Sequence, residues 1–404
     1  MQLLGHGSQE GMVVAPKEMI SPRACGRLTW AEVDLEAIAH NLQLVRALVG
    51  PEREIMAVVK ADAYGHGAVA VARKVLEAGA NWLGVALPEE GMALREAGIR
   101  CPILVLGPTM PQQARQLLEG DLSVSLYSLE MAMALHTEAS RRGVSAKVHV
   151  KVDTGMGRLG LEPAQSLELL EKLRSMPRIR IEGLYTHLAT ADDPDPSFAL
   201  KQLDRLLEVD RLARERGIRV PFRHAANSAA LLTLPESRLD LVRPGIMIYG
   251  CDSGFRSRLP VELRPALAWK TLVAHLRELS PGESVSYGRT FVATRPTVIG
   301  VLPVGYADGL PRRLSNRGEA LVRGRRVSMV GSICMDVTMV DLTHVPGASV
   351  GDEVVLIGRQ GQESITADHM AQVAGTIPYE ILCGLTPRVP RYYLDGPQQG
   401  KETG

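Results

Sequence analysis

The stretch AVVKADAYGHG, residues 57–67, places a lysine at the end of an apolar run. Ile55 and Met56 precede it, so the run of apolar residues continues from Ile55 until it closes on Lys60. A strand with one face in water alternates apolar and polar residues, so an unbroken run predicts a strand covered on both faces, as in parallel sheets. We therefore expect Lys60 to stand where this strand leaves a dry interior.

Short apolar runs then alternate with helical patterns along the chain. The first helical pattern follows Asp34, a candidate N-cap, and repeats apolar residues such as Ile38 and Leu42 at helical spacing. Strands are expected at 54–60, 82–86, 102–106, 122–126, 147–153, 180–187, 222–225 and 240–243. Eight β–α units over about 200 residues favour a (β/α)8 TIM-type barrel over an open doubly wound sheet, although periodicity alone separates these two architectures poorly.

The pattern changes past residue 262, where strands follow one another without long helices. TVIGVLPVGYADG (297–309) and GDEVVLIG (351–358) are examples. This predicts a second, β-rich domain. The expected division is a flexible extension over 1–26, a barrel over 27–262, a β-strand domain over 263–397 and a flexible tail over 398–404.

Composition narrows the class of partner. The 404 residues include 46 basic and 45 acidic ones, so no overall field would attract nucleic acid or an anionic membrane. No run approaches the roughly 20 apolar residues that span a bilayer. The five cysteines are far apart and form no metal-ligand pair, which suits reduced thiols in a cytoplasm and predicts no metal site. We expect a cytoplasmic protein that binds a small molecule.

Polar residues that end apolar runs are the candidates for a site, because barrel enzymes carry their chemistry at the carboxyl ends of the strands. Five sets occupy that position, and we expect them to ring a single pocket. They are Lys60, Lys151 with Asp153, His187, the segment His224 to Ser228, and Arg243.

Seven motifs, in order, resemble the alanine racemase family over about residues 27–394. They are AVVKADAYGHG, KVDTGMGRLG (151–160), HAANSAA (224–230), RPGIMIYG (243–250), VSYGRTF (285–291), VGYADG (304–309) and GSICMDVTMVDL (331–342). The resemblance implies a barrel that binds pyridoxal 5′-phosphate (PLP), a carboxyl-terminal β domain, and a homodimer with composite active sites. It also implies interconversion of L- and D-alanine, which supplies D-alanine for peptidoglycan.

The resemblance assigns two catalytic residues, Lys60 and Tyr287. Lys60 would hold PLP as a Schiff base and act as a base on one face of the substrate, and burial would favour its neutral amine. Tyr287 would serve the opposite face, with His187 orienting it. Read alone, a lysine at a strand end usually extends to water, and a tyrosine on a strand usually packs there.

Arg243 is matched to the residue that faces the pyridine nitrogen of PLP, with His224 as its partner. A permanent cation there disfavours protonation of the nitrogen and should suppress decarboxylation and transamination. This separates the family from same-fold decarboxylases, for which an acidic residue is expected. An Arg-Pro pair after a strand is otherwise unremarkable.

The remaining matches concern the phosphate of PLP and the carboxylate of the substrate. Phosphate contacts fall on Tyr64, Ser228, Gly245, Ile246 and Tyr379, and Asn227 or Ser228 also suits a helix cap. Arg158 in a glycine-rich loop would bind the carboxylate, completed by Met335 and Asp336 of the partner subunit. Lys151 matches a lysine that is carbamylated in some members. A solvated arginine in such a loop is the alternative for Arg158.

Two other functions stay open. One is a non-catalytic PLP carrier with the same barrel, although such proteins resemble a barrel alone and this chain continues through Tyr287 and Met335. The other is a racemase of broader amino-acid range. Assays with alanine, serine and lysine would separate these functions.

Overall fold

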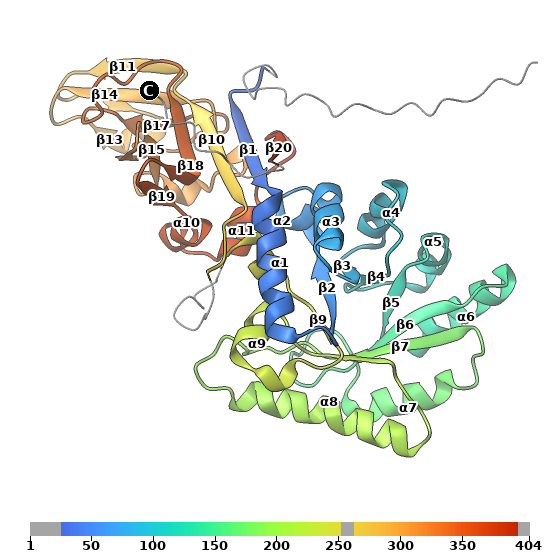
Figure 1. Cartoon of the computed structure of the whole chain (residues 1–404). Coiled ribbons are helices and arrows are strands. Elements are labelled where there is room, and N and C mark those ends of the chain that lie inside the picture. Colours follow the sequence, from blue (N-terminus) through green and yellow to red (C-terminus); the bar gives the residue numbers. More distant parts are fainter. Residues whose placement is uncertain (1–25, 252–261, 395–404) are drawn as a thin grey trace, which may run out of the picture.

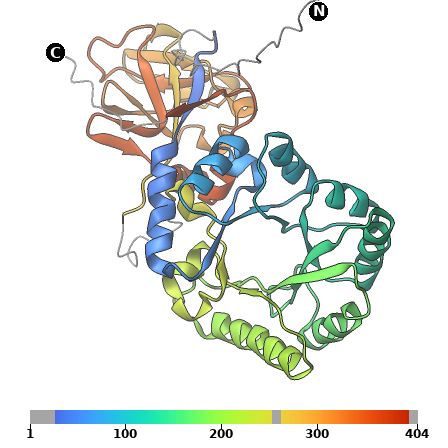
Figure 2. The same ribbon diagram turned by 45° about the vertical axis from the view of Figure 1, so that its right-hand side comes forward.

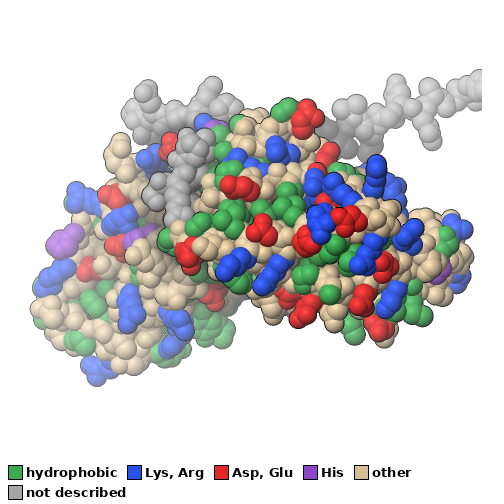
Figure 3. All heavy atoms as spheres, turned by 90° about the horizontal axis from the view of Figure 1, so that it is seen from below, with side chains coloured by type: hydrophobic (Ala, Val, Ile, Leu, Met, Phe, Trp, Pro, Cys, Tyr) green, Lys and Arg blue, Asp and Glu red, His purple; other side chains and the backbone are tan. Residues whose placement is uncertain are grey.

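The computed structural model describes residues 26–251 and 262–394, which form a barrel and a β-rich domain side by side (Figure 1). The predicted extension over 1–26 lies outside this range except for Gly26, and the predicted tail over 398–404 lies wholly outside it. In the part of the chain that is described, no helix is long and apolar enough to cross a membrane. Figure 3 shows side chains of both charges interspersed over one face of the molecule.

The barrel contains eight parallel strands, and Figure 2 looks into their ring. Their order is β8-β7-β6-β5-β4-β3-β2-β9, and two backbone hydrogen bonds, Asp240 N to Arg223 O and Arg243 N to Ala226 O, bridge the remaining gap between β8 and β9. The strands are β2 (Glu54–Val58), β3 (Trp82–Val85), β4 (Ile103–Val105), β5 (Ser123–Leu126), β6 (Ala146–Lys151), β7 (Ile179–Tyr185), β8 (Phe222–His224) and β9 (Leu241–Val242). All eight predicted strands are present, and the predicted fold class is confirmed.

Helices surround the strands because each has one apolar face to bury. In α1 the side chain of Asp34 accepts a hydrogen bond from Ala37 N, as the predicted cap requires, and Ile38 and Leu42 are fully buried. The outer helices are α1 (Leu35–Val49), α3 (Ala68–Glu77), α4 (Pro88–Glu96), α5 (Ala114–Glu119), α6 (Leu129–Arg142), α7 (Pro163–Leu173), α8 (Ser197–Glu215) and α9 (Ser228–Thr233).

The second domain is built on a seven-stranded sheet ordered β16-β15-β18-β10-β1-β20, with β19 paired to β18. A three-stranded sheet, β11-β14-β17, and the hairpin β12-β13 complete its strands. The bounds are β10 (Leu267–Leu272), β11 (His275–Leu279), β12 (Ser284–Val285), β13 (Phe291–Val292), β14 (Thr297–Leu302), β15 (Glu319–Val322), β16 (Arg325–Ser328), β17 (Thr338–Asp341), β18 (Glu353–Gln360), β19 (Glu363–Ile365), β20 (Arg391–Leu394), α10 (Ala367–Ala374) and α11 (Pro378–Cys383).

The first strand, β1 (Thr29–Asp34), differs from the predicted division, which placed it in the barrel range 27–262. It pairs antiparallel with β10 and parallel with β20, so it belongs to the sheet of the second domain. Its partners lie more than 200 residues away, and a local pattern of strand followed by helix carries no information about such pairing. The described part of the chain therefore runs from β1, in the sheet of the second domain, into the barrel through α1.

Candidate active site

A cavity of about 360 Å³ opens at the carboxyl ends of the barrel strands. It brings together eleven of the residues predicted from sequence, contributed by several strands, as in other barrel enzymes. They are Lys60, Tyr64, Lys151, Arg158, His187, Asn227, Ser228, Arg243, Gly245, Ile246 and Tyr379.

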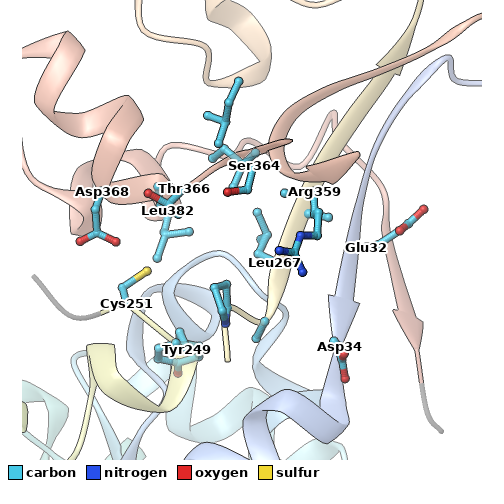
Figure 4. A pocket seen from close by; sticks show the side chains of 18 of the residues that line it. Glu32, Asp34, Tyr249, Cys251, Leu267, Arg359, Ser364, Thr366, Asp368 and Leu382 are labelled. Carbon is cyan, nitrogen blue, oxygen red and sulfur yellow. The ribbon is translucent and has the colours of Figure 1, made fainter. Parts of the chain in front are cut away.

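A larger cavity of about 540 Å³ lies between the two domains. Figure 4 shows Tyr249 on its barrel side, Thr366 and Asp368 on its β-domain side, and Asp34 where β1 ends. None of the predicted site residues lines it. The predicted site residues therefore gather around the smaller cavity.

Lys60 opens an unusual left-handed turn, α2 (Lys60–Tyr64). The residues Ala61 to Tyr64 all have φ of 52–53°, a conformation that costs an L-residue roughly 1–2 kcal/mol. Backbone hydrogen bonds close the turn, from Ala63 N to Val59 O and from Gly65 N to Ala61 O. Strain of this kind persists only where the surroundings hold it in place.

Two carboxylates and a close packing contact hold the turn. Glu90 Oε1 accepts from Ala61 N at 2.7 Å, and Asp62 Oδ1 accepts from Ala68 N at 2.7 Å. Gly65 has φ of 80°, and a Cβ there would lie 2.2 Å from Leu382 O of α11. The turn is thus built against the second domain, and it fixes where the Lys60 side chain begins.

The cavity is strongly cationic. Lys60, Lys151, Arg158 and Arg243 line it, and no carboxylate occurs among its described lining residues. Burial, followed by the charge of Arg158, lowers the pKa of Lys60. Burial, followed by Arg243 and Arg158, lowers the pKa of Lys151 to about 8. Such a cavity favours an anionic ligand and makes a neutral lysine amine accessible near neutral pH.

Arg243 is buried, and three short hydrogen bonds hold it, beside a longer contact of 3.5 Å from its Nη2 to His187 Nδ1. Its Nη1 donates to His224 Nδ1 at 2.8 Å, and its Nη2 donates to the carbonyl oxygens of Thr186 at 2.8 Å and Ala225 at 3.0 Å. His224 contacts the arginine and does not itself line the cavity. The pKa of His187, which does line it, falls to about 3 because of burial and then Arg243.

Ser228 and Tyr64 bring hydroxyl groups to the cavity lining. Ser228 Oγ accepts from Gly245 N at 2.8 Å, while Asn227 is the residue that caps α9, by accepting from Ala230 N at 2.9 Å. A Cβ on Gly245 would lie 2.7 Å from Tyr64 Oη, so glycine leaves the space that this hydroxyl occupies. These groups form a cradle of neutral donors.

Arg158 is carried by a loop that Asp153 organises. Asp153 Oδ1 accepts from Gly155 N at 3.0 Å and from Gly157 N at 3.1 Å, and these backbone donors outweigh burial and lower its pKa. The loop leaves Arg158 exposed at the rim of the cavity. A guanidinium there can reach a carboxylate that enters from solvent.

Family models for "Alanine racemase, N-terminal domain" and "Alanine racemase, C-terminal domain" match residues 33–253 and 266–393. The chain belongs to the alanine racemase family. The alanine racemase of Halothermothrix orenii is 48% identical over 91% of this chain and 97% of its own length. The alanine racemase of Symbiobacterium thermophilum is 50% identical over 91% of this chain and 97% of its own length. The crystal structure of alanine racemase from Bacillus anthracis with bound L-Ala-P is 40% identical, with a TM-score of 0.87 and coverage of 91% and 95%.

This membership makes the chain an isomerase and confirms the predicted family. Two of the motifs quoted from the sequence lie away from the cavity. Tyr287, Met335 and Asp336 sit on the β domain and do not line the cavity of their own chain. Tyr287 is 74% exposed and Met335 is 52% exposed, while Asp336 pairs with Arg388 at 2.7 Å.

The loops that carry Tyr287 and Met335 are tied to each other. Ser332 Oγ donates to Tyr287 O at 3.0 Å, and Ser286 Oγ donates to Ser332 O at 2.5 Å. The segments that carry the two exposed side chains are therefore joined by hydrogen bonds.

Tyr185 also lines the cavity and was not predicted from sequence. Its ring stacks on His224 with centroids 4.5 Å apart, and Lys151 Nζ lies 5.3 Å from its centroid. Strand parity could have found it, because Tyr185 and His187 are two positions apart and so share a direction at the end of β7. His149 lies two positions before Lys151 on β6, so strand parity likewise predicts that both side chains point to the same face of the strand.

Proposed function

We propose that this chain interconverts L-alanine and D-alanine by a two-base reaction with PLP held in the barrel cavity. One observation carries the proposal: a half-buried lysine at a strand end, with a lowered pKa, shares a cavity with three further cations and a cradle of hydroxyl groups. PLP brings an aldehyde, a phosphate and a pyridine nitrogen, and each has a counterpart among these residues.

The donors fit the cofactor group by group. Lys60 supplies the amine for the aldehyde, and Arg243 supplies a donor-only neighbour for the ring nitrogen. Tyr64, Ser228, Tyr379 and the backbone around Gly245 and Ile246 would hold the phosphate, with Asn227 fixing the start of α9 beside it. Bound PLP withdraws electrons from Cα of the substrate and so weakens its bond to hydrogen.

Lys60 is the base for one face of Cα. Burial, and then the charge of Arg158, lowers the pKa of its amine. This favours the neutral amine, which is the form that a nucleophile and base needs. Arg158 would bind the substrate carboxylate at the rim, with Lys151 between it and Arg243. The guanidinium of Arg243 disfavours a protonated ring nitrogen and so limits side reactions.

The second face of Cα requires a second base, because one side chain cannot reach both. We assign this role to Tyr287 of the partner subunit, oriented by His187, in a homodimer with composite sites. The exposure of Tyr287 and Met335, and their distance from the cavity lining of their own chain, support this assignment. The partner subunit's Met335 and the partner subunit's Asp336 would complete the carboxylate site.

The product would serve peptidoglycan synthesis in the cytoplasm, and neither nucleic acid nor a membrane is needed as a partner. The near-balanced charge of the sequence supports this view.

An absorbance spectrum of the purified protein between about 300 and 500 nm, before and after borohydride, tests the cofactor assignment. We expect a visible band that borohydride removes, a reduced adduct on Lys60 found by peptide mass spectrometry, and D-alanine formed from L-alanine. A band without racemisation of alanine, serine or lysine would favour a carrier. Equal turnover of all three would favour a broad racemase, and no band after PLP is added would overturn the proposal.

A further inference from the structure

A chain of buried polar side chains runs from Arg243 into the interior of the barrel, away from the cavity. Arg243 Nη1 lies 2.8 Å from His224 Nδ1, and His224 Nε2 lies 2.9 Å from His149 Nδ1. All three side chains are buried, and both histidines are fully so. Beyond them, His149 Nε2 lies 3.9 Å from Glu182 Oε2.

The direction of every proton in this chain follows from Arg243. A guanidinium can only donate, so His224 Nδ1 must accept and carries no proton. A neutral imidazole has one proton, which is then on His224 Nε2 and is donated to His149 Nδ1. His149, neutral by the same reasoning, carries its proton on Nε2. Burial, and then Arg243, lowers the pKa of both histidines, that of His149 to about 3, which agrees with neutral rings.

The end of the chain faces a carboxylate. His149 Nε2 is buried without a hydrogen-bond partner among the described residues, and at 3.9 Å Glu182 attracts its N–H without forming a hydrogen bond. Glu182 is itself held, since Ser123 Oγ donates to it at 3.0 Å and Arg180 Nε lies 3.5 Å away. The charge of Glu182 thus favours the tautomer of His149 with its proton on Nε2, which the hydrogen bond from His224 requires.

The fold reserves space for the His149 ring. A Cβ on Gly183 of the adjacent strand β7 would lie 2.0 Å from His149 Nδ1 and 2.6 Å from its Cγ. The edge of Trp82 closes the other side, with ring centroids 5.2 Å apart at 79°. The pairing of β6 with β7 shifts register between Val148 and His149. The imidazole therefore occupies a fixed place in the barrel interior.

We propose that His149, with Glu182 behind it, is a positioning residue that locks His224 as a hydrogen-bond acceptor for Arg243. Without His149, the Nε2–H group of His224 would be buried without its acceptor, and moving that proton to Nδ1 would place two donors face to face at 2.8 Å. Arg243 would lose one of its three anchors. The consequence for catalysis rests on the proposed function, in which Arg243 faces the ring nitrogen of PLP.

The proton order can be read from ¹⁵N chemical shifts of histidine-labelled, full-length holoenzyme. We expect His149 and His224 to be Nε2–H tautomers that do not titrate between about pH 6 and 8, with resonances assigned by their loss in single variants. A proton on Nδ1 of either ring in the wild-type protein would overturn the proposal. This readout stands even if the protein does not racemise alanine, so failure of the proposed function and failure of the relay are distinguishable.

Four variants test the consequence for Arg243. His149→Leu removes the acceptor, Gly183→Ala displaces the ring without changing it, and His149→Asn keeps an acceptor oxygen near the position of Nδ1. Leu117→Ala, in the fully buried core under α5, is the control for lost stability. We expect kcat for alanine to fall about 10- to 100-fold in His149→Leu and Gly183→Ala, with KM unchanged, since a hydrogen bond to a charged group is lost.

His149→Asn should retain most of kcat, and Leu117→Ala should keep both kcat and the His224 tautomer. Unchanged kcat and unchanged His224 shifts in His149→Leu would sink the proposal, as would an equal loss of kcat in Leu117→Ala at a matched melting temperature. If His149→Leu and Gly183→Ala do not fold, the tautomers of the wild-type protein and kcat of His149→Asn still test the proposal.

Discussion

The two halves of the site are built in opposite ways. The barrel half is enclosed: Lys60, Lys151 and Arg243 are wholly or largely buried, and backbone or side-chain contacts from several strands hold their surroundings. The β-domain half is open, with Tyr287 74% exposed and Met335 52% exposed. A side chain used for chemistry needs a dry and fixed environment, which Tyr287 lacks in its own chain. Under the proposed function, one chain would hold the cofactor and a second copy would complete the site.

The largest effect is expected for Lys60→Ala, which removes the proposed nucleophile of the barrel half. We expect racemisation to fall at least about 10⁴-fold and the visible band to disappear, because the covalent link and one base are lost together. Lys172→Ala, an exposed lysine on α7, is the matched control and should behave as wild type. Retention of both the band and the activity in Lys60→Ala would remove this residue from the mechanism.

Tyr287→Phe changes only the open half. PLP should remain bound, while proton removal from L-alanine slows about 10²- to 10⁴-fold, more than removal from D-alanine. Isotope effects with α-deuterated L- and D-alanine measure the two directions separately. Equal slowing of the two proton-removal steps, from L-alanine and from D-alanine, would contradict the assignment of one base to each face.

Mixing the two variants asks whether the halves come from different chains. In a dimer of one Lys60→Ala chain and one Tyr287→Phe chain, a composite arrangement leaves one site with both residues intact. Random pairing then restores about a quarter of the wild-type activity from two inactive parents. If each chain used its own Tyr287, co-expression would restore nothing.

The sequence predicted the enclosed half well, and physical chemistry explains why. Buried parallel strands are unbroken apolar runs, so the residues that end them, such as Lys60 and Arg243, mark the rim of the barrel. Position along one strand is local information. The pairing of β1 with β10 and β20, and the relay from Arg243 to Glu182, depend on contacts between distant segments, which periodicity does not encode.

The left-handed turn after Lys60 was also beyond sequence reasoning, for the opposite reason. Its residues Ala61 to Tyr64 have no local preference for positive φ, so propensity argues against the conformation they adopt. Tertiary contacts with Glu90 and α11 help to stabilise it. The glycines at 65 and 67 were visible in the sequence, but they do not specify the four residues before them.

Gly65→Ala tests how far the enclosed half depends on that turn. The new Cβ would meet Leu382 O at 2.2 Å, so we expect the free energy of unfolding to fall by about 1–3 kcal/mol and PLP to bind more weakly. Gly79→Ala is the control, because Gly79 also has positive φ, at 104°, but nothing lies within 4 Å of a Cβ there. Denaturant unfolding and PLP titration should separate the two. Equal losses would assign the effect to φ alone and not to the packing of the turn.

The last prediction concerns the charge of Lys151 and the pH dependence of stability. Lys151 is 6% exposed, and its pKa is lowered from the ordinary 10.5 to about 8, first by burial and then by Arg243 and Arg158. Between these values the unfolded chain binds a proton that the folded chain does not, so stability rises with pH across that window. Lys151→Met removes this dependence.

At pH 7 the cofactor-free Lys151→Met protein should therefore be more stable than wild type, by at most about 3 kcal/mol, and the gain should vanish as pH rises from about 8 to 10.5. Thermal unfolding at several pH values measures it, with Lys172→Met as the exposed control. A variant that is less stable than wild type at pH 7 would mean that Lys151 is not a buried cation at all. Intact mass spectrometry at that pH would then show whether a carbamate has neutralised it, in which case the enclosed half supplies its own anion.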